Sequence, residues 1–391
     1  MRKKFNQRGV VTMLYLDNAA TSYRKPTAVY LSLLKNTITN SANAGRGGHS
    51  YSIKAAKGIY ETTEKLCELF NIPSTERLAY TQNATLALNL AILGMMSESS
   101  HTVITQMEHN SVLRPIHKTC RYTMVKADKF GRVNANDVEK AICLDTKMII
   151  MTHASNVCGT IQPIEETAKI AHKHGLLFMV DAAQTAGCLP IDVQKTGIDL
   201  LAFSGHKGLM TPMGVGGLYI KDGIMPNPVI TGGTGSMSES ITQPDFMPDI
   251  LQSGTLNAPA IIAAKKSIEL ILKETPQAIG EKEFYIAKRL INSLKNIPGV
   301  MVYGLEKENR NGTVAFNIDG IDSVTASDIL NNEYGICTRG GWHCAYPAHV
   351  ALGTEKSGAI RASFGYFNSK KDADRLANAI YKISKSKMIK K

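Results

Sequence analysis

The stretch LLAFSGHKGLMTP, residues 200–212, joins an apolar run to a group of small and chemically active side chains. Leu200–Phe203 has the character of a buried strand, and it stops at Ser204. His206 and Lys207 follow within three residues. A solvent-facing turn has no need of this combination, because any small polar residues would serve there. We therefore infer that this strand ends in a functional site.

Three further short apolar runs precede this one, and helical patterns separate them. The runs are Thr102–Thr105, Met148–Met151 and Leu176–Val180, and one helix begins at Pro163 and stops at Gly175. Short buried strands that alternate with helices are typical of a mainly parallel sheet covered on both faces. The predicted fold class is therefore α/β.

Polar side chains follow each of these four strands. The segments are Glu108–Asn110, His153–Asn156, Asp181–Gln184 and Ser204–Lys207. Ligands of such sheets bind at the carboxyl ends of the strands. Polar residues after a single strand would indicate only a turn. Polar residues after four successive strands indicate that these strand ends form a single site.

The C-terminal third has a different pattern and predicts a smaller α+β domain. Its expected elements are helices at Lys265–Leu272, Glu281–Leu294 and Asp372–Ser384, and strands at Gly312–Ile318 and Arg361–Phe364. The boundary is expected near residues 254–264. We assign residues 14–258 to a large domain and residues 259–391 to a small C-terminal domain, with residues 1–30 packing against the small one.

The net charge of +12 is concentrated at the two ends of the 391-residue chain. Nine of these charges lie in stretches without acids, Arg2, Lys3, Lys4 and Arg8 in the head and Lys382, Lys385, Lys387, Lys390 and Lys391 in the tail. We expect solvated tails and no nucleic-acid partner, because the body of the protein is nearly neutral. The pattern leaves open whether Met1 or Met13 is the native start.

Other function classes are also disfavoured by the sequence. No apolar run reaches the roughly 18 residues that span a bilayer, and the head lacks the apolar segment of a signal peptide. The seven cysteines are an odd number without a CxxC pair, which fits a reducing cytoplasm. No HExxH motif is present, and His172 and His174 diverge on their helix, so no metal is expected.

Lys207 is the candidate catalytic residue of the opening stretch. A free lysine has a pKa of about 10.4 and is protonated at neutral pH, so it is a poor nucleophile. Its commonest use at the end of a buried strand is a Schiff base with an aldehyde cofactor. Pyridoxal phosphate would need three further groups: an acid for the ring nitrogen, a phosphate cradle, and a residue that holds the ring.

The chain offers a candidate for each group. Asp181 follows an apolar strand, although an N-cap or turn aspartate is the alternative. Asn83 caps a predicted helix at residues 84–93, whose free amides would attract phosphate, with Ser204 and His206 on the other side. His109 would stack on the ring and exchange protons near its ordinary pKa of about 6.5, although a surface histidine is the alternative.

These motifs resemble the class V aminotransferase group of pyridoxal-phosphate enzymes, and within it the cysteine desulfurases and selenocysteine lyases. The resemblance runs from YLDNAAT, residues 15–21, to RASFGYFN, residues 361–368. Between them GRGGHSYS, TQNATLALNL, EHNSVLRP, HASNVCGTIQPI, VDAAQTAG, AFSGHKG and SGTLN appear in the family's order. The resemblance implies fold type I, with a mainly parallel seven-stranded sheet in the large domain.

The resemblance also implies a role for each site residue. Lys207 would carry the cofactor aldehyde, Asp181 would pair with the ring nitrogen, and Gln184 would bond the ring hydroxyl, while His109 would stack on the ring. Phosphate would contact Asn83, Ala84, Thr85, Ser204 and His206, and Thr255 would reach it from the other subunit of a homodimer. Asn156, near the cofactor, and Arg361 would hold the substrate carboxylate, with Arg339 nearby.

The segment RGGWHCA, residues 339–345, resembles the loop of SUF-type, or group II, desulfurases that carries the sulfur-accepting cysteine. Cys344 would attack the substrate sulfur as thiolate, and Arg339 or His343 would increase the thiolate fraction. A buried structural thiol is the alternative for Cys344. Two departures stand out: Trp342 replaces a frequent histidine, and Asn83-Ala84 replaces the usual Gly-Thr, which leaves fewer side-chain contacts for phosphate.

The predicted function is pyridoxal-phosphate-dependent cysteine desulfurase, which converts L-cysteine to L-alanine and holds the sulfur as a Cys344 persulfide. Selenocysteine lyase or another class V lyase or transaminase is the alternative. The expected partners are an amino acid substrate, a second subunit and a protein sulfur acceptor, as in iron–sulfur cluster assembly. The physiological substrate and the acceptor stay open.

Overall fold

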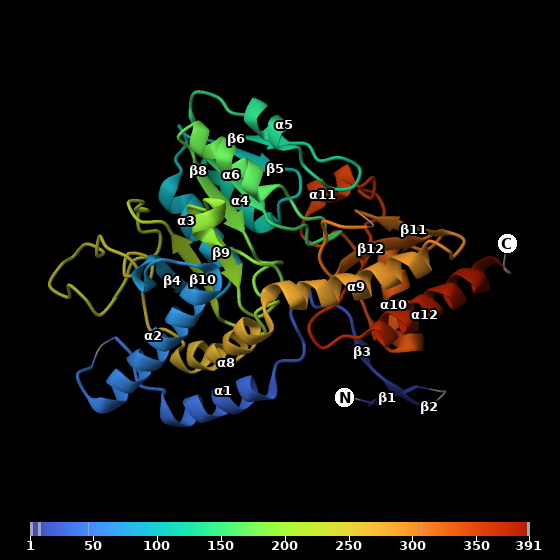
Figure 1. Ribbon diagram of the computed structural model, residues 1–391, viewed down its shortest axis with the longest axis horizontal. Helices are drawn as coiled ribbons and strands as arrows, with labels where there is room; N and C mark the ends of the chain where they lie inside the picture. The colour runs from blue at the N-terminus through green and yellow to red at the C-terminus, as the bar shows by residue number, and fades with distance from the viewer. Residues whose placement is uncertain (1–2, 7–8, 46, 306, 389–391) are drawn as a thin grey trace.

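The computed structural model describes residues 3–6, 9–45, 47–305 and 307–388. Its centre is a seven-stranded sheet with the order β4-β10-β9-β8-β7-β5-β6 (Figure 1). The strands are β4 (Leu78–Thr81), β5 (His101–Thr105), β6 (Arg121–Val125), β7 (Thr146–Thr152), β8 (Leu177–Asp181), β9 (Leu200–Ser204) and β10 (Gly216–Ile220). Only β10 runs antiparallel to its neighbours within this sheet. The predicted α/β class and mainly parallel sheet are confirmed.

Helices cover both faces of this sheet, as the alternation of its side chains requires. Ile149 of β7 points into a core shared with α2, α6 and α8, whereas Ile150 points into the core beneath α3 and α4. The helices of this region are α1 (Thr27–Thr39), α2 (Ser50–Phe70), α3 (Ala84–Met95), α4 (Asn110–Thr119), α5 (Ala135–Lys140), α6 (Ile164–Lys173), α7 (Val193–Thr196) and α8 (Ala258–Glu274), with the 3₁₀ helix η1 (Thr75–Arg77).

The C-terminal region builds a second layer beside the large sheet. It holds an antiparallel sheet of order β11-β12-β14 and a parallel pair of β13 with β3. Its elements are β3 (Leu14–Tyr15), α9 (Pro276–Leu294), β11 (Val300–Tyr303), β12 (Thr313–Ile318), α10 (Ser323–Tyr334), β13 (Ile336–Cys337), α11 (Tyr346–Ala351), β14 (Ile360–Ser363) and α12 (Lys370–Met388).

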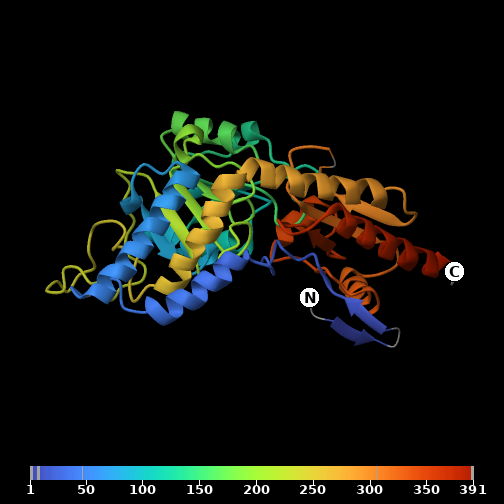
Figure 2. The same cartoon turned by 60° about the horizontal axis from the view of Figure 1, so that its bottom comes forward.

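The change from one hydrophobic core to the other falls within α9. Ile279 still belongs to the core of the large sheet, and Ile286 belongs to the core of the C-terminal sheet. Helix α8 packs on α1 and α2, as Figure 2 shows. Leu14 and Leu16 join the second core. Helix α8 thus packs with the large sheet, whereas the predicted boundary assigns it to the small domain. The division after residue 258 stays a prediction.

Part of the basic head forms regular secondary structure, and the expectation that the head is solvated stays a prediction. β1 (Lys3–Asn6) pairs with β2 (Gly9–Thr12) in an antiparallel hairpin. At the other end, Lys382 and Lys385 are exposed on α12. Arg2, Arg8, Lys390 and Lys391 lie outside the described residues, as does Met1. No helix in the described ranges has both the length and the apolar character needed to cross a bilayer.

Candidate active site

A cavity of about 260 Å³ lies at the carboxyl ends of β8 and β9 and is closed by segments of the C-terminal region. All the predicted site residues except Thr255 line it: Asn83, Ala84, Thr85, His109, Asn156, Asp181, Gln184, Ser204, His206, Lys207, Arg339, Cys344 and Arg361. They come from widely separated parts of the chain. The four strand ends therefore converge, as the strand-end argument requires.

The N-terminus of α3 faces this cavity and offers an anion site. Asn83 caps the helix, and its side-chain oxygen accepts a hydrogen bond of 3.0 Å from the Leu86 amide. The Ala84 amide donates to Ser204 Oγ at 2.9 Å. Among the described residues, the Thr85 amide has no hydrogen-bond partner. One free donor and the positive end of the helix dipole therefore face the cavity.

His206 adds a second free polar group to the anion site. Its Nδ1 is buried and has no hydrogen-bond partner among the described residues. Burial and the neighbouring charges of Lys207 and Lys25 lower the pKa of His206 to about 4, so the ring is neutral at neutral pH. Its carbonyl accepts from Thr21 Oγ1 at 3.0 Å, Ser22 N at 2.9 Å and Lys25 Nζ at 3.1 Å. These contacts fix the loop before the lysine.

Lys207 and Asp181 form the electrostatic centre of the cavity. Burial lowers the pKa of Lys207 to about 8, Asp181 opposes this, and Arg361 and Arg339 add to it. Burial also raises the pKa of Asp181, which accepts a hydrogen bond of 2.9 Å from Ala183 N. Asp181 thus makes the turn contact considered as an alternative and lines the cavity as well. The lowered pKa gives Lys207 a neutral amine at mildly alkaline pH.

His109 lies at the entrance to α4 and caps it. Its Nδ1 accepts from the Ser111 amide at 3.1 Å and contacts Ser111 Oγ at 2.8 Å, and Ser111 Oγ in turn contacts Thr85 Oγ1 at 2.7 Å. Burial, then the charges of Lys207 and Arg361, lowers the pKa of His109 to about 4. His109 is therefore neutral at neutral pH, which departs from the expected proton exchange near pH 6.5.

Arg361 is buried at the floor of the cavity with only 1% of its surface exposed. Its Nη2 donates to Asp17 Oδ1 at 2.7 Å and its Nη1 to the Asn156 carbonyl at 2.9 Å, while Nε has no partner among the described residues. The Asn156 side chain donates to the His343 carbonyl at 2.7 Å. Both residues predicted to hold the substrate carboxylate thus also organise the protein around the cavity.

Cys344 reaches the cavity from the loop between β13 and α11. Its side chain is exposed, so the alternative of a buried structural thiol is wrong. His343 is buried, and burial together with the Arg361 charge lowers its pKa well below the usual value. Because His343 is neutral, its charge offers no help to the Cys344 thiol, and the predicted effect on Cys344 stays a prediction. Arg339 is the remaining candidate, and it lines the same cavity.

Two residues next to the site were given no role of their own in the sequence analysis. Asp17 belongs to the quoted YLDNAAT motif, but only the fold brings it to Arg361. Glu108 precedes His109 and is fully buried; its Oε1 accepts from Thr152 N at 3.0 Å, and its Oε2 has no partner among the described residues. Burial, reinforced by Asp181, raises the pKa of Glu108 to about 8. The sequence motif EHNS, which begins with Glu108, was the signal that could have pointed to this residue.

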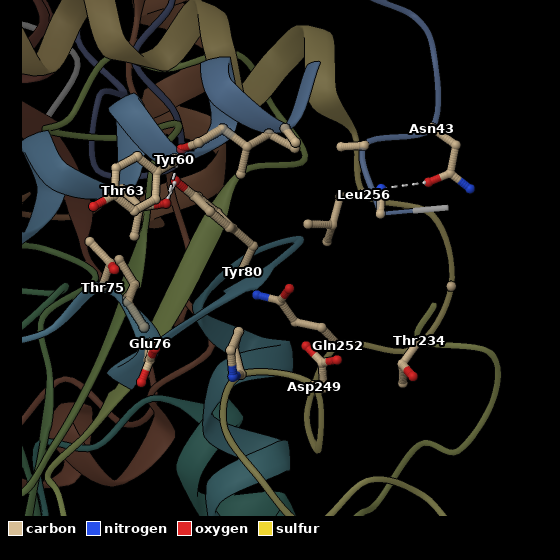
Figure 3. Close-up of a pocket in the computed structure, with 17 residues that line it drawn as sticks. Asn43, Tyr60, Thr63, Thr75, Glu76, Tyr80, Thr234, Asp249, Gln252 and Leu256 are labelled. Carbon is tan, nitrogen blue, oxygen red and sulfur yellow. Dashed lines mark hydrogen bonds between the residues drawn. The ribbon is translucent and has the colours of Figure 1, made fainter. Parts of the chain in front are cut away.

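Thr255 is the one predicted site residue that lies elsewhere. It sits between Gly254 and Leu256, which line a second cavity of about 410 Å³. Figure 3 shows that cavity between Tyr60 and Thr63 of α2 and Gln252 of the long connection after β10. The Thr255 hydroxyl is exposed and contacts Asn43 Nδ2 at 3.5 Å. Within one chain, Thr255 therefore does not contribute to the Lys207 cavity.

Metal-binding and disulfide chemistry find no support in the geometry of the described ranges. No group of three or more histidine, cysteine, aspartate or glutamate side chains there is arranged to hold a metal ion. His172 contacts Asp199 at 3.0 Å instead, in a pair at the base of the sheet. None of the seven cysteines, all of which lie within the described ranges, forms a disulfide.

Comparison with known proteins identifies what this arrangement resembles. The profile of the family described as Aminotransferase class-V matches residues 14–376. A probable cysteine desulfurase of Methanothermobacter thermautotrophicus is 32% identical over 95% of this chain and 94% of its own, and one of Halalkalibacterium halodurans is 34% identical over 95% and 93%. The family resemblance inferred from the sequence is confirmed.

Solved structures agree with the relatives found by sequence. The apo cysteine desulfurase of Thermococcus onnurineus superposes with a TM-score of 0.88 at 30% identity, covering 96% of this chain and 95% of the other. The cysteine desulfurase CsdA of Escherichia coli gives a TM-score of 0.83 at 26% identity, covering 95% and 94%. The predicted fold type is consistent with these neighbours.

Proposed function

The chain belongs to the class V aminotransferase family, and we propose that it is a pyridoxal-phosphate-dependent cysteine desulfurase whose sulfur acceptor is Cys344. The observation that carries the proposal is the convergence of Lys207, Asp181 and Cys344 on one cavity. A transaminase would use the first two residues and has no need of a thiol. The relatives named as cysteine desulfurases support the same choice.

The residues around the cavity fit pyridoxal phosphate. The free Thr85 amide, the buried Nδ1 of the half-buried His206 and the Ser204 hydroxyl form a set of uncharged polar groups for a phosphate. Asp181 would pair with the ring nitrogen, Gln184 would bond the ring hydroxyl, and His109 would stack on the ring. When bound, the cofactor supplies an aldehyde that condenses with amines and a ring that accepts the electron pair left at the substrate α-carbon.

The remaining steps belong to side chains of this protein. Arg361 and Asn156 hold the substrate carboxylate, with the free Nε of Arg361 as the available donor. Lys207 Nζ takes the α proton, which its pKa of about 8 permits because the neutral amine is accessible near physiological pH. Cys344 lines the same cavity, so its thiol faces the space in which the substrate sulfur would lie.

Sulfur transfer then proceeds between two sulfur atoms. The Cys344 thiolate forms a bond to the substrate sulfur while the carbon–sulfur bond breaks, and the electron pair stays with the substrate carbon. That carbon takes up a proton and becomes the methyl group of L-alanine, so a thiol and L-cysteine give a persulfide and L-alanine. Because Cys344 is exposed, an acceptor thiol, such as that of an iron–sulfur assembly protein, can collect the sulfur.

We also propose a homodimer in which Thr255 of each chain completes the phosphate site of the other. Helix α1 supports it, because α1 packs on α8 while its opposite side exposes Tyr30, Leu31, Leu34 and Ile38. A contiguous apolar stripe on a surface helix is typical of a protein interface. The exposed Thr255 contacts Asn43, which follows α1 in the chain, and its neighbour Leu256 lines the cavity of Figure 3.

The first test measures L-alanine and sulfide formed from L-cysteine with a thiol reductant present. Wild type should release both, and Cys344→Ala should release neither above background. Cys143→Ala is the matched control, since Cys143 is the other exposed cysteine. If Cys344→Ala keeps wild-type activity, sulfur transfer through Cys344 is wrong. If activity then requires a keto acid, the protein is a transaminase, and if only selenocysteine reacts, it is a lyase.

A further inference from the structure

The loop that carries Cys344 is held in an unfavourable backbone conformation. His343 has a φ of 51° and Cys344 a φ of 58°, so two consecutive residues with side chains lie in the left-handed region. Each such residue costs roughly 1–2 kcal/mol relative to the right-handed region. The contacts around the loop must therefore stabilise this conformation, and the buried side chain of His343 makes two of them.

Both ring nitrogens of His343 have a partner. Nε2 lies 3.1 Å from the Arg339 carbonyl, and Nδ1 lies 3.3 Å from Nε2 of His349 on α11. The distance between these two nitrogens is shorter than the 5.4 Å between the ring centroids. The two imidazole rings therefore face each other through the edges that carry these nitrogens. At the far side, His349 Nδ1 lies 2.7 Å from Thr354 Oγ1. The three side chains form a continuous relay.

Only one arrangement of protons satisfies this relay when both rings are neutral. The Arg339 carbonyl can only accept, so His343 Nε2 carries a proton and His343 Nδ1 accepts. His349 must then donate from Nε2 and accept at Nδ1 from the Thr354 hydroxyl. His349 is therefore the residue that supplies the donor to His343, and Thr354 fixes the tautomer of His349.

The surroundings keep both rings neutral. Burial lowers the pKa of His349 to about 4, although a hydrogen bond with the Trp342 main chain opposes this. For His343, burial and the charges of Arg361 and Arg339 act in the same direction. His349 is fully buried, so its ring has no water to replace a lost partner. The donor pattern is therefore maintained across the physiological pH range.

We propose that His349 is a positioning residue for sulfur transfer: it donates to His343 and so fixes the Cys344 loop over the cavity. The proposal rests on the function proposed above, because it concerns the approach of Cys344 to the substrate sulfur. His349 does not line the cavity and touches no reacting atom. Its effect passes through His343, whose carbonyl is also held by Asn156 at 2.7 Å.

The test compares two nearly isosteric replacements, His349→Met and His349→Gln. Glutamine places an amide donor near the position of Nε2, whereas methionine has none. We expect the methionine variant to lower kcat for alanine formation by roughly tenfold with KM within about twofold, the loss of one buried hydrogen bond. The glutamine variant should recover most of that loss. Thr354→Val is a milder third variant, since it removes only the tautomer-fixing donor.

A second measurement needs no turnover and separates this proposal from the proposed function. Amide hydrogen exchange of the peptide covering residues 339–345 should be roughly tenfold faster in His349→Met and near wild type in His349→Gln. If the two variants behave alike in exchange and in kcat, or if both match wild type, the relay has no positioning role. If wild type forms no alanine while exchange follows the expected order, the function is wrong and the relay stands.

Discussion

The amide of Asn110 donates a hydrogen bond of 2.8 Å to the carbonyl oxygen of Cys344. This bond joins the first residue of α4 to the loop of the C-terminal region that carries the candidate nucleophile. Because His109 caps the same helix, the residue expected to stack on the cofactor and the residue expected to accept sulfur share one main-chain anchor.

Asn110→Pro tests this anchor without disturbing α4. Proline is tolerated at the first helical position, and His109, with φ −75° and ψ 156°, already has the backbone that precedes a proline. The variant removes the donor to Cys344 and places the proline Cδ against the Cys344 carbonyl oxygen, so the loop must move away from α4, and we expect kcat for alanine formation to fall roughly tenfold. Asn110→Ala keeps the amide and should retain wild-type kcat. Equal activity of the two variants would show that the bond is dispensable.

Asp181→Asn should abolish the electronic role of the acid and leave the local turn intact. Asparagine still accepts from the Ala183 amide, which donates 2.9 Å to Asp181 in the wild type. Asparagine cannot hold a proton on the ring nitrogen by its charge, so we expect the rate of alanine formation to fall by roughly 100-fold or more. Alanine formation and cofactor content should be measured together. A variant that retains cofactor and full activity would rule out the assigned role.

The strand-end argument found the chemical core of the site, because the ends of parallel strands meet wherever such a sheet forms. Lys207, Asp181 and His109 follow from that rule and from the residue types alone. Asp17 and His349 could not be found in this way, since each acts through a residue that is distant in sequence or lies behind the cavity wall. Helical periodicity likewise predicted a helix at Lys265–Leu272 but not that its apolar face packs on α1 and α2.

Stability should depend on pH through the buried carboxyl of Glu108. Its pKa rises from 4.5 to about 8 on folding, so between these values the folded state binds more protons than the unfolded state. Stability contributed by this group is present below about pH 4.5 and is lost as the pH rises toward 8. The loss is on the order of a few kcal/mol. Urea unfolding of wild type and Glu108→Gln at pH 6 and pH 8.5 measures it.

Glutamine cannot ionise, so the free energy of unfolding of Glu108→Gln should change less between these two pH values than that of wild type. Glu283→Gln is a useful comparison, because burial raises the pKa of Glu283 to about 8 as well. Each replacement should flatten part of the pH dependence. An unchanged slope in Glu108→Gln would mean that Glu108 is not the titrating group.

Leu34→Glu tests the proposed dimer. Leu34 is 61% exposed on the apolar stripe of α1, and a charge there should be expelled from a buried interface. We expect wild type to sediment as a dimer and the variant as a monomer with reduced cofactor affinity, because Thr255 would no longer reach the partner's site. Leu144→Glu is the control, since Leu144 is 98% exposed in a turn remote from α1. Wild type that sediments as a monomer contradicts the dimer.

Helix α9 connects the two hydrophobic cores rigidly. It runs unbroken for 19 residues, with Ile279 anchored beneath the large sheet and Ile286 anchored in the C-terminal core. A rotation of one core relative to the other would require α9 to bend, or Ile279 or Ile286 to leave its apolar surroundings. The shape of the cavity between the two cores therefore depends on the short segments that line it, and the loop of Cys344 is one of them.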